Sequence, residues 1–336
     1  MKILIAGGAG FIGSTIASAA IDAGHVPVIL DNLATGRREF CRDRAFYEGD
    51  IADSTLVEKI FTEHPDIAAV VHCAALIVVP DSVAHPVHYY RENVAKTLEF
   101  VDAIARLGCH RLIFSSSASI YAAGEDFTVD EDSAIAPMSP YARTKAVVEG
   151  MLSDVAAALP LRVLSLRYFN PIGSDPRLRT GLQLPAPSHA LGQIIAAHQT
   201  GRPFNVTGLG WPTRDGSGLR DYIHVWDLAE AHVAALERFD TLFPDTSPGS
   251  LAINLGTGTG TTVLELVDAF NRVVDHPVTV AEAPPRAGDV AGAYTRSARA
   301  GELLGWTAHR SIDDGIRDTL RWFAVRDRTL PDLARP

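Results

Sequence analysis

Short apolar runs alternate with helix-like segments along the first half of the chain. Alternation of buried strands and helices is typical of a parallel sheet that is covered by helices on both faces. The sequence therefore predicts an α/β fold with a Rossmann-type, doubly wound parallel sheet. The runs expected to form strands are residues 2–6, 26–30, 45–47, 69–73, 111–114 and 162–166.

This rhythm fades after about residue 170, where glycine and proline become more frequent. We predict a Rossmann domain at 1–170 and a smaller C-terminal substrate-binding lobe at 171–330, whose first part, 171–215, is expected to be rich in loops. The segments near 221–236 and 251–271 show strand and helix patterns, and we expect these segments to belong to the first domain.

Four glycines, Gly7, Gly8, Gly10 and Gly13, lie between the first strand and a helix expected over 14–23. Their spacing satisfies both G-x-G-x-x-G and G-x-x-G-x-x-G. Glycines permit a tight turn, close approach of backbone N–H groups to phosphates, and close packing of the helix on the strand. The helix N-terminus adds about half a positive charge. A dinucleotide pyrophosphate is expected here; the alternative is a glycine-rich turn that binds nothing.

An acidic residue, Asp31, ends the second apolar run. A carboxylate there accepts hydrogen bonds from the adenosine ribose and repels a 2′-phosphate, so NAD is favoured over NADP. Arg37 and Arg38 offer a 2′-phosphate site in principle, but a solvated basic loop is the preferred interpretation. Asp50, after the third strand, is expected to hold the adenine amino group, and the small residues 73–75 to let the cofactor pass.

A second glycine-rich turn, Gly256-Thr257-Gly258-Thr259-Gly260, also follows an apolar run and precedes a helical pattern. No acidic residue ends a following strand at a suitable distance. We interpret this segment as a strand-to-helix turn capped by Thr261 or Thr262 rather than as a phosphate site.

Candidate catalytic chemistry begins with a helix expected over 140–158, because Ser139 suits the N-cap and Pro140 the first helical position. Tyr141 and Lys145 then lie four residues apart on one helix face. Free tyrosine, with a pKa of about 10, is a poor base at neutral pH. Lys145, the helix N-terminus and a cationic nicotinamide ring are each expected to lower that pKa. The phenolate is then able to take a proton from a substrate hydroxyl.

A serine run, Ser115-Ser116-Ser117, follows the expected fifth strand. Its hydroxyls are expected to hydrogen-bond the substrate oxygen from which Tyr141 takes the proton. The alternative is that Tyr141 packs in the core and Lys145 lies on the surface, because this spacing is common by chance.

Composition limits the partners of this chain. Its 336 residues are 47% hydrophobic and 21% charged, which is ordinary for a globular protein. A net charge of −10 argues against nucleic acid, which demands a basic face. Three cysteines without disulfide or zinc spacing favour a reducing, cytoplasmic compartment and no metal. The longest nearly apolar run, 67–80, is too short to span a bilayer, so no membrane association is expected.

Several motifs together resemble the UDP-glucose 4-epimerases, a family of extended short-chain dehydrogenase/reductases. Matching segments run from about residue 2 to residue 322, and the last two motifs are the most specific. These motifs are the glycine turn, Asp31-Asn32-Leu33, the serine run, Tyr141-x-x-x-Lys145, Leu166-Arg167-Tyr168-Phe169-Asn170-Pro171 and Gly218-Leu219-Arg220-Asp221-Tyr222-Ile223-His224-Val225.

The resemblance implies 4-epimerisation of a UDP-hexose, the interconversion of UDP-glucose and UDP-galactose, with no net redox change. Tyr141 and Ser117 act on the sugar 4-hydroxyl while the C4 hydride passes to tightly held NAD⁺. The 4-keto sugar then turns over and receives the hydride on its other face. A homodimer joined through helices flanking the sheet, with the Tyr141 helix among them, is also implied.

The same resemblance assigns site residues. Implied catalytic residues are Tyr141, Lys145 and Ser117. Implied cofactor-binding residues are Gly7, Gly10, Phe11, Ile12, Gly13, Asp31, Asn32, Gly36, Asp50, Ile51, Cys73, Ala74, Ala75, Asn93, Tyr141, Lys145 and Phe169. Implied substrate-binding residues are Ser117, Tyr141, Asn170, His189, Arg220 and Arg286, with the two arginines meeting the diphosphate.

Some of these residues have structural alternatives. Asn170 is equally able to cap a turn before Pro171, and Arg220 to pair with Asp221 in a surface ladder. His224 is interpreted as structural.

Three positions depart from the family pattern. Ile77 stands where the family has a lysine near cofactor and sugar, and Ser188-His189 replaces the usual asparagine pair, so that a sugar contact passes to His189. Ala293 stands where the family often has tyrosine or cysteine, and we hypothesise that the enlarged pocket tolerates an N-acetyl group at C2. UDP-N-acetylglucosamine and UDP-glucuronate are therefore alternative substrates, the latter needing an arginine from 177–179.

Other functions make different demands. A nucleotide-sugar dehydrogenase or reductase keeps the same base but exchanges its NAD during turnover. A 4,6-dehydratase needs an acid beside the tyrosine, which Ser117-Ala118-Ser119 does not supply. A non-enzymatic dinucleotide sensor is expected to have lost Tyr141 or Lys145, and both are present.

Overall fold

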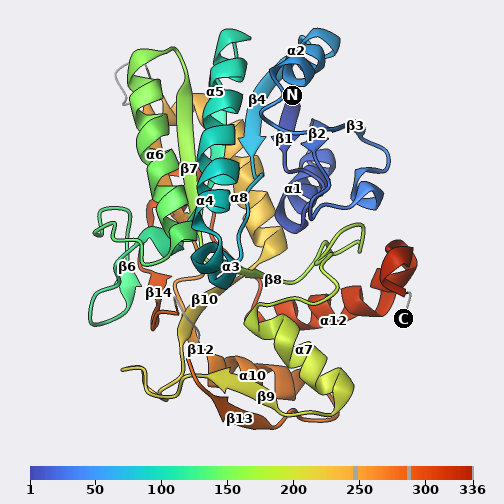
Figure 1. Ribbon diagram of the computed structural model, residues 1–336, viewed down its shortest axis with the longest axis vertical. Helices are drawn as coiled ribbons and strands as arrows, with labels where there is room; N and C mark the ends of the chain where they lie inside the picture. Colours follow the sequence, from blue (N-terminus) through green and yellow to red (C-terminus); the bar gives the residue numbers. More distant parts are fainter. Residues whose placement is uncertain (245–248, 286–288, 335–336) are drawn as a thin grey trace.

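A seven-stranded parallel sheet lies at the centre of the larger part of the molecule (Figure 1). The structure is a computed structural model that describes residues 1–244, 249–285 and 289–334. The strand order is β11-β7-β5-β4-β1-β2-β3, and all neighbours are parallel. The predicted Rossmann-type fold is thus confirmed. The strands are β1 (Lys2–Ala6), β2 (Val26–Asp31), β3 (Ala45–Glu48), β4 (Ile67–His72), β5 (Arg111–Ser117), β7 (Arg162–Tyr168) and β11 (Ser250–Leu255).

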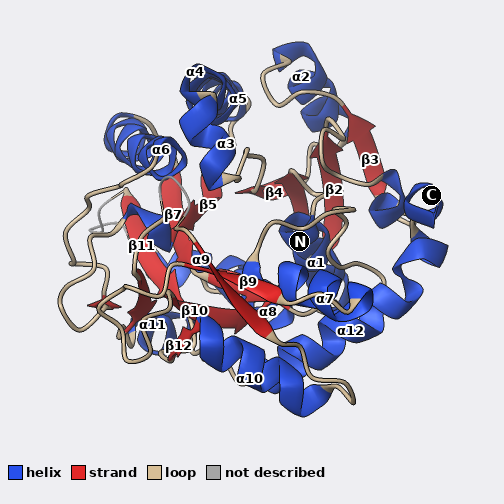
Figure 2. Ribbon diagram, turned by 60° about the horizontal axis from the view of Figure 1, so that its bottom comes forward, coloured by secondary structure: helices blue, strands red, loops and turns tan. Residues whose placement is uncertain are grey.

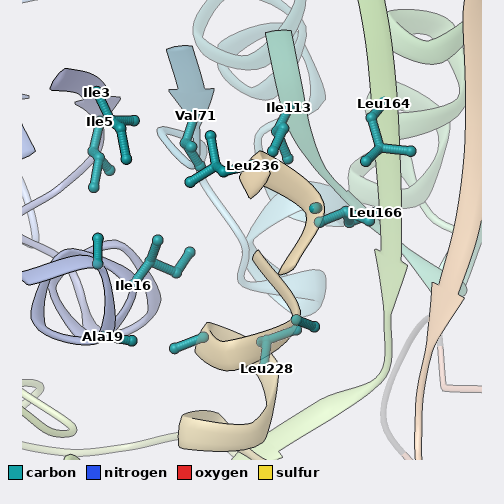
Figure 3. Packing of buried hydrophobic residues seen from close by; sticks show 14 of the residues in the cluster. Ile3, Ile5, Ile16, Ala19, Val71, Ile113, Leu164, Leu166, Leu228 and Leu236 are labelled. Atoms are coloured by element: carbon teal, nitrogen blue, oxygen red, sulfur yellow. The ribbon is translucent and has the colours of Figure 1, made fainter. Parts of the chain in front are cut away.

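Helices cover both faces of this sheet (Figure 2). Because side chains alternate along a strand, Ile3 and Ile5 of β1 enter one hydrophobic core while Leu4 and Ala6 enter the other. Figure 3 shows the first core, in which Ile16 faces the strands. This face carries α1 (Phe11–Asp22), α8 (Val225–Glu237) and α11 (Arg299–Leu304), and the opposite face α2 (Ser54–Glu63), α5 (Lys96–Arg106) and α6 (Pro140–Ala158).

The strand order reverses at β1, which has β2 on one side and β4 on the other. The chain first builds outward from β1 to β3 and then crosses back to β4. Ligands of open α/β sheets bind beyond the carboxyl ends of the strands at such a reversal. The fold therefore directs attention to the loops that follow β1, β2 and β4.

A smaller part gathers below the large sheet in Figure 1. It contains a sheet of order β12-β10-β14-β6, with β8 paired to β10, and a separate pair of β13 and β9. Its own hydrophobic core includes Leu191, Leu266, Phe270 and Ile316. The elements are β6 (Thr128–Val129), β8 (Asn170–Ile172), β9 (Phe204–Thr207), β10 (Leu219–His224), β12 (Gly260–Thr262), β13 (Val280–Ala283), β14 (Gly292–Thr295), α7 (Ala190–Thr200), α10 (Val263–Val273) and α12 (Ile312–Thr329).

Short helical segments complete the described chain. No helix in the described ranges is long and apolar enough to cross a membrane. The short segments are α3 (Val79–Ala84), α4 (Pro86–Tyr90), a π-helical turn (Arg91–Ala95), α9 (Phe239–Leu242) and 3₁₀ turns at Arg38–Cys41, Ala118–Ile120 and Pro331–Ala334.

The structure differs from the sequence predictions in three places. Strand β5 continues through Ser117 because Ser115, Ser116 and Ser117 pair in register with β7, so the serine run belongs to the strand and does not follow it. Helix α1 begins at Phe11, three residues before the predicted start. The region 171–215, expected to be rich in loops, also contains α7 and β9, which pack in the smaller core.

Candidate active site

Backbone packing leaves no room for a side chain at two positions of the turn after β1, Gly7 and Gly13. Gly7 has a φ of +79°, and a Cβ there would lie 2.5 Å from the backbone nitrogen of Ala74, just beyond β4. A Cβ on Gly13 would lie 2.3 Å from the carbonyl oxygen of Gly7. Glycine at both positions is thus a steric requirement of the close approach of this turn to α1 and to the end of β4.

The helix after this turn has an N-terminus without a side-chain cap. Helix α1 begins after Gly10, and no side chain among the described residues caps it. The first N–H groups of a helix have no intrahelical partner, so those of Phe11, Ile12 and Gly13 face the turn together with the positive end of the helix dipole. This arrangement fits the diphosphate of a dinucleotide.

Asp31 organises the loop that follows β2. Its buried carboxylate accepts the backbone N–H groups of Ala9 at 2.9 Å and Leu33 at 2.8 Å. Burial raises the Asp31 pKa, although both hydrogen bonds oppose this. A Cβ on Gly36 would lie 2.7 Å from Oδ1, so the loop passes directly over the carboxylate. Each oxygen keeps a lone pair for a further donor such as a ribose hydroxyl.

The two arginines near Asp31 are engaged with acids. Arg37 Nη1 lies 2.5 Å from Oδ2 of Asp332, and Arg38 pairs with Glu48. Both guanidinium charges are therefore balanced within the protein. This supports the interpretation of the segment as a basic loop rather than as a 2′-phosphate site.

Asp50 lies just beyond β3 at the same edge. Lys96 Nζ donates to its Oδ2 at 2.6 Å, and the N–H of Ala52 donates to Oδ1 at 3.0 Å. Burial raises the pKa of Asp50, but the hydrogen bond from Lys96, helped by one from Asn32, leaves it below its usual value. Asp50 is thus an ionised acceptor, and Ile51 beside it is buried.

Asn93 fixes the segment that follows β4. Its side chain donates to the carbonyl of Leu76 at 2.9 Å, accepts the N–H of Leu76 at 2.8 Å, and donates to Thr144 Oγ1 at 3.1 Å. Cys73 Sγ lies 3.1 Å from Ser115 Oγ. Burial raises the pKa of this thiol to about 11, so Cys73 is a neutral group at physiological pH.

Helix α6 carries Tyr141 and Lys145 to this edge. Ser139 caps the helix and Pro140 occupies its first position, as predicted. Lys145 Nζ donates to the carbonyl oxygen of Ser115 at 2.7 Å. Burial lowers the pKa of Lys145 to about 8. The alternative of a surface lysine is therefore wrong.

The Ser117 hydroxyl, which lies 2.9 Å from Ser119 Oγ, also acts on the pKa of the Tyr141 phenol. Burial raises the pKa of the phenol, and the Ser117 hydroxyl opposes this only in part. For the protein alone, the expected lowering is thus not found, because the Lys145 ammonium is directed at a backbone carbonyl and burial dominates. A lowered Tyr141 pKa then depends on the positive charge of the nicotinamide ring of bound NAD⁺.

The three serines of β5 have different partners because side chains alternate along a strand. Ser115 faces the thiol beyond β4, Ser116 donates to Glu149 of α6, and Ser117 acts on the pKa of Tyr141. Only Ser117 of the three therefore acts on the phenol.

The parallel sheet brings most of the predicted site residues to one edge, because its strands all end there. The residues that lie at or just beyond the carboxyl ends of β1, β2, β3, β4, β5 and β7 are Gly7, Gly10, Phe11, Ile12, Gly13, Asp31, Asn32, Gly36, Asp50, Ile51, Cys73, Ala74, Ala75, Ser117 and Phe169, with Asn93, Tyr141 and Lys145 added from the helices.

The predicted substrate residues lie where the large sheet meets the smaller part. Asn170 begins β8 and is paired with Tyr222 of β10, so it is a strand residue and not a turn cap. Arg220 Nη1 donates to the carbonyls of Leu219 at 2.6 Å and Ala291 at 3.0 Å.

The proposed surface pair of Arg220 and Asp221 is wrong. Asp221 is fully buried, and its carboxylate accepts hydrogen bonds from Thr257 and Gly258. Adjacent strand residues point to opposite faces, which separates the two side chains.

His189 caps α7 through its ring, since Nδ1 accepts the N–H of Gly192 at 3.2 Å. Burial lowers its pKa to about 4, so the ring is neutral, and its proton resides on Nε2. Ile77, where the family pattern has lysine, is 58% exposed. Arg286 lies outside the described residues.

His224 has a structural contact, as predicted. It caps α8 by accepting the N–H of Trp226 at 3.0 Å, and its Nε2 lies 3.3 Å from Asp318 of α12. A Cβ on Gly173 would overlap the ring. The imidazole is thus enclosed between elements of the smaller part.

One cluster resembles a metal site by its residue types, namely Asp227, Glu230 and His309. The guanidinium of Arg310 pairs with both acids, lying 2.8 Å from Glu230 Oε2. An arginine thus supplies the positive charge that a metal ion would otherwise bring.

The sequence analysis missed a buried network beside the site. Arg167 Nη2 lies 2.6 Å from Glu149 Oε2, and Arg167 Nη1 donates to Tyr121 Oη at 2.7 Å. Tyr121 in turn donates to Asn254 at 2.7 Å. The available signal was Arg167 itself, a charged residue within an apolar strand, which requires a buried partner.

Comparison with known proteins agrees with this geometry. Residues 3–256 match the model of the NAD dependent epimerase/dehydratase family. A UDP-glucose 4-epimerase of Bacillus subtilis is 39% identical over 333 residues, covering 96% of each chain. The chain belongs to the UDP-glucose 4-epimerase family.

Solved structures of this family show the same fold. A UDP-glucose 4-epimerase from Stenotrophomonas maltophila, solved with bound NAD and formylated UDP-arabinopyranose, has a TM-score of 0.91 at 36% identity, covering 98% of this chain and 99% of that chain. The enzyme from Bifidobacterium longum, in complex with NAD⁺ and UDP, has a TM-score of 0.89 at 32% identity, covering 98% and 100%.

Proposed function

We propose that this protein is an isomerase that interconverts UDP-glucose and UDP-galactose by NAD-dependent 4-epimerisation. The observation that carries the proposal is the convergence of three features at one sheet edge. Tyr141 and Lys145 lie one helical turn apart on α6, Lys145 is bonded to the end of β5 that carries Ser117, and the glycine turn lies at the same edge. A candidate proton acceptor and a dinucleotide cradle thus converge at one edge of the sheet.

The chemistry that NAD supplies when bound is reversible hydride acceptance. Tyr141 removes the proton of the sugar 4-hydroxyl, and Ser117 hydrogen-bonds the same oxygen. Loss of that proton and of the C4 hydride leaves a 4-keto sugar. After the 4-keto sugar rotates to present its other face, Tyr141 returns the proton as C4 regains the hydride. The reaction therefore involves no net redox change. The ammonium of Lys145 holds the carbonyl of Ser115 at the end of β5, and its positive charge adds to that of the nicotinamide ring in supporting the phenolate.

The cofactor-binding residues have separate roles in this proposal. The first-turn N–H groups of α1 bind the diphosphate, Asp31 binds the adenosine ribose, and Asp50 binds the adenine amino group. Residues 1–170, with later segments near 221–236 and 251–271 that return to them, form the NAD-binding domain, and 171–330 form mainly the nucleotide-sugar lobe. The places of α8 and β11 on the large sheet support the returns. The further cofactor-binding residues are Gly7, Gly10, Phe11, Ile12, Gly13, Asn32, Gly36, Ile51, Cys73, Ala74, Ala75, Asn93, Tyr141, Lys145 and Phe169.

Substrate binding relies on fewer groups. Asn170, Arg220 and Arg286 contact the nucleotide sugar, with the arginines at the diphosphate. His189 donates from Nε2 to a sugar oxygen, which is supported by the cap that occupies its Nδ1. We also propose that Ala293, which packs in the cluster containing Phe169, leaves space for an N-acetyl group at C2.

A UDP-glucuronate 4-epimerase has weaker support. Arg177 Nη1 lies 2.9 Å from Asp22, and Arg179 pairs with both Asp22 and Asp175. The positive charges of both arginines are therefore balanced by carboxylates within the protein. A carboxylate at C6 thus lacks the arginine that the sequence analysis considered for it.

We further propose a homodimer and a cytoplasmic location. Exposed apolar side chains on α4, α5 and α6 suit a helical interface, namely Val87, Tyr90, Leu98 and Val147. Three unpaired cysteines suit a reducing compartment.

The test is to incubate the purified protein, without added NAD, with UDP-glucose, UDP-N-acetylglucosamine and UDP-glucuronate separately. Sugar NMR is expected to show inversion of UDP-glucose at C4. Tyr141→Phe is expected to lower kcat by at least about 10³-fold, whereas the control Tyr47→Phe, which affects a tyrosine bonded to Glu63, is expected to leave kcat unchanged. Inversion of none of the sugars overturns the proposal.

Two other functions give different results in the same experiment. A dehydrogenase or reductase would change nicotinamide absorbance in step with turnover, while the epimerase leaves it constant. A dinucleotide sensor would bind NAD and convert no sugar.

A further inference from the structure

Two side chains of α6 hold two consecutive residues of β5. Lys145 Nζ donates to the carbonyl oxygen of Ser115 at 2.7 Å. Glu149, one helical turn further on, accepts the hydroxyl of Ser116. The strand that ends in Ser117 and the helix that begins with Tyr141 are therefore tied together at two successive points.

Glu149 is itself held in place by a buried arginine. Arg167 Nε lies 3.0 Å from Oε1 of Glu149, and Nη2 lies 2.6 Å from Oε2, which is a bidentate arrangement. The side chain of Glu149 is 10% exposed and that of Arg167 is 7% exposed. Arg167 lies opposite Ser116 in the register of β5 and β7, so one carboxylate of α6 spans both strands.

The groups that surround Lys145 carry little other charge. From β4, burial lowers the pKa of His72 to about 3 and raises that of Cys73 to about 11, so both are neutral. From β7, burial raises the pKa of Tyr168, which is neutral as well. Tyr141, from α6, also has a raised pKa.

Apart from the neutral Cys73, the group among the described residues whose charge acts on the Lys145 pKa is Glu149, which is paired with Arg167. The other carboxylate of α6, that of Asp154, is exposed to solvent. Glu149 is thus the acid that the fold buries on the Lys145 side of the helix.

We propose that Glu149 is a positioning residue of the active site, which fixes the end of β5 against α6 through Ser116 and supplies the negative charge that keeps Lys145 an ammonium. This inference rests on the proposed function, in which Tyr141 and Lys145 act together. It assigns Glu149 no contact with substrate or cofactor.

Electrostatics give this role a measurable consequence. Burial lowers the pKa of Lys145 to about 8. The Cys73 thiol, with a pKa of about 11, is neutral in this pH range, so the negative charge that opposes the lowering is that of Glu149. Loss of the Glu149 charge lowers the Lys145 pKa further. Because the mechanism needs the ammonium, the alkaline limb of the activity profile then moves to lower pH.

The test compares kcat across pH 6–9 for the holoenzyme and its Glu149→Gln variant, with bound NAD and Tm measured on the same samples. The alkaline limb of the kcat profile of the variant is expected to lie about one pH unit lower than that of the native enzyme. The variant is then about fivefold slower than the native enzyme at pH 8 and less than about twofold slower at pH 6.5.

Further variants separate charge from packing. Glu149→Asp keeps the charge and is expected to restore the native pH limb, even where its Tm is lowered. Asp154→Asn removes the exposed acid of the same helix and is the matched control. If Glu149→Gln fails to fold because it leaves Arg167 buried without a partner, Glu149→Gln/Arg167→Met removes both charges and is expected to show the same direction of shift.

The outcomes are distinct. A loss of kcat that is equal at every pH, with an unmoved alkaline limb, overturns the inference and leaves Glu149 a packing residue. A native enzyme that epimerises none of the three UDP-sugars overturns the proposed function, and this inference with it, before any variant is compared.

Discussion

Two glycine-rich turns of this protein follow a strand of the large sheet, but they differ in what comes next and in what completes them. The first leads directly into α1, whereas the second leads into the short strand β12 and only then into α10, which corrects the predicted strand-to-helix turn. At the turn of residues 7–13, no side chain within the described ranges caps α1. At the turn of residues 256–260, the carboxylate of Asp221 accepts the N–H of Thr257 at 2.8 Å and of Gly258 at 3.1 Å. Thr262 and Glu265 then close the N-terminus of α10 with a reciprocal capping box, which confirms the predicted threonine cap.

The difference shows what makes a glycine turn a phosphate site. Both turns supply backbone N–H groups, which favour an anion, and the first adds the N-terminus of α1. In the second turn the protein provides that anion itself, as Asp221. In the first turn Asp31 accepts the N–H of Ala9, but the first N–H groups of α1 have no side-chain cap among the described residues and are left for a ligand. The glycines bring this turn against the end of β4.

The largest difference between the two turns is expected in NAD binding when one glycine of each turn is replaced by alanine. Gly7→Ala places a Cβ 2.5 Å from the backbone of Ala74, whereas Gly258→Ala meets nothing nearer than 3.7 Å. Both glycines have similar positive φ values, of +79° and +75°, so the cost of the left-handed backbone is matched at about 1–2 kcal/mol. Gly7→Ala is expected to weaken NAD binding by about 100-fold or more.

The measurement is bound NAD per chain together with Tm for both variants. Gly258→Ala is expected to lose stability and keep its NAD. Equal NAD loss in the two variants would contradict the assignment of the first turn alone to the cofactor.

The next effect concerns the internal anion of the second turn. Asp221→Asn removes the charge and turns an amide donor toward a buried N–H group, and is expected to lower the free energy of unfolding by about 2–4 kcal/mol. Urea titration measures this loss. NAD content per folded chain is expected to stay constant, and a variant as stable as the native protein would show that Asp221 does not complete the turn.

A smaller effect is expected at the uncapped helix. A Cβ on Gly10 would lie 3.5 Å from the carbonyl oxygen of Gly7, an ordinary contact, so Gly10→Ala is expected to fold with an unchanged Tm. A methyl group beside the bound diphosphate is expected to weaken NAD binding by about tenfold, which corresponds to about 1.4 kcal/mol. Unchanged affinity, measured by equilibrium dialysis, would mean that the phosphates bind elsewhere.

The smallest effect is a pH dependence of the second turn. The hydrogen bond from Arg214 lowers the pKa of Glu265 against the opposing effect of burial. A lowered pKa stabilises the fold above the usual carboxyl pKa of about 4, and this contribution disappears as the pH falls through the folded value. Glu265→Gln is expected to lower stability by less than about 1 kcal/mol at pH 7. The difference from the native protein should shrink as the pH falls below the usual carboxyl pKa, and urea titrations at pH 7 and at acid pH measure it.

Local patterns were sufficient for much of the fold and of the site. The glycine spacing, Asp31, and the Ser139-Pro140 helix start predicted the edge where these residues converge, because turns and caps depend on neighbouring residues. The length of β5 was not predicted, because serines do not favour a strand and pairing with β7 decides the matter. The pKa of Tyr141 was not predicted either, because burial depends on packing around the whole ring.

The sequence by itself determined the order of strands and helices, the glycine cradle and the family, since these depend on residues near one another in the chain. Only the tertiary structure decided which turn is completed by Asp221, that Arg167 pairs with Glu149, and that Lys145 faces Ser115. A buried charge has to find its partner across elements, and sequence separation does not reveal which partner lies within reach.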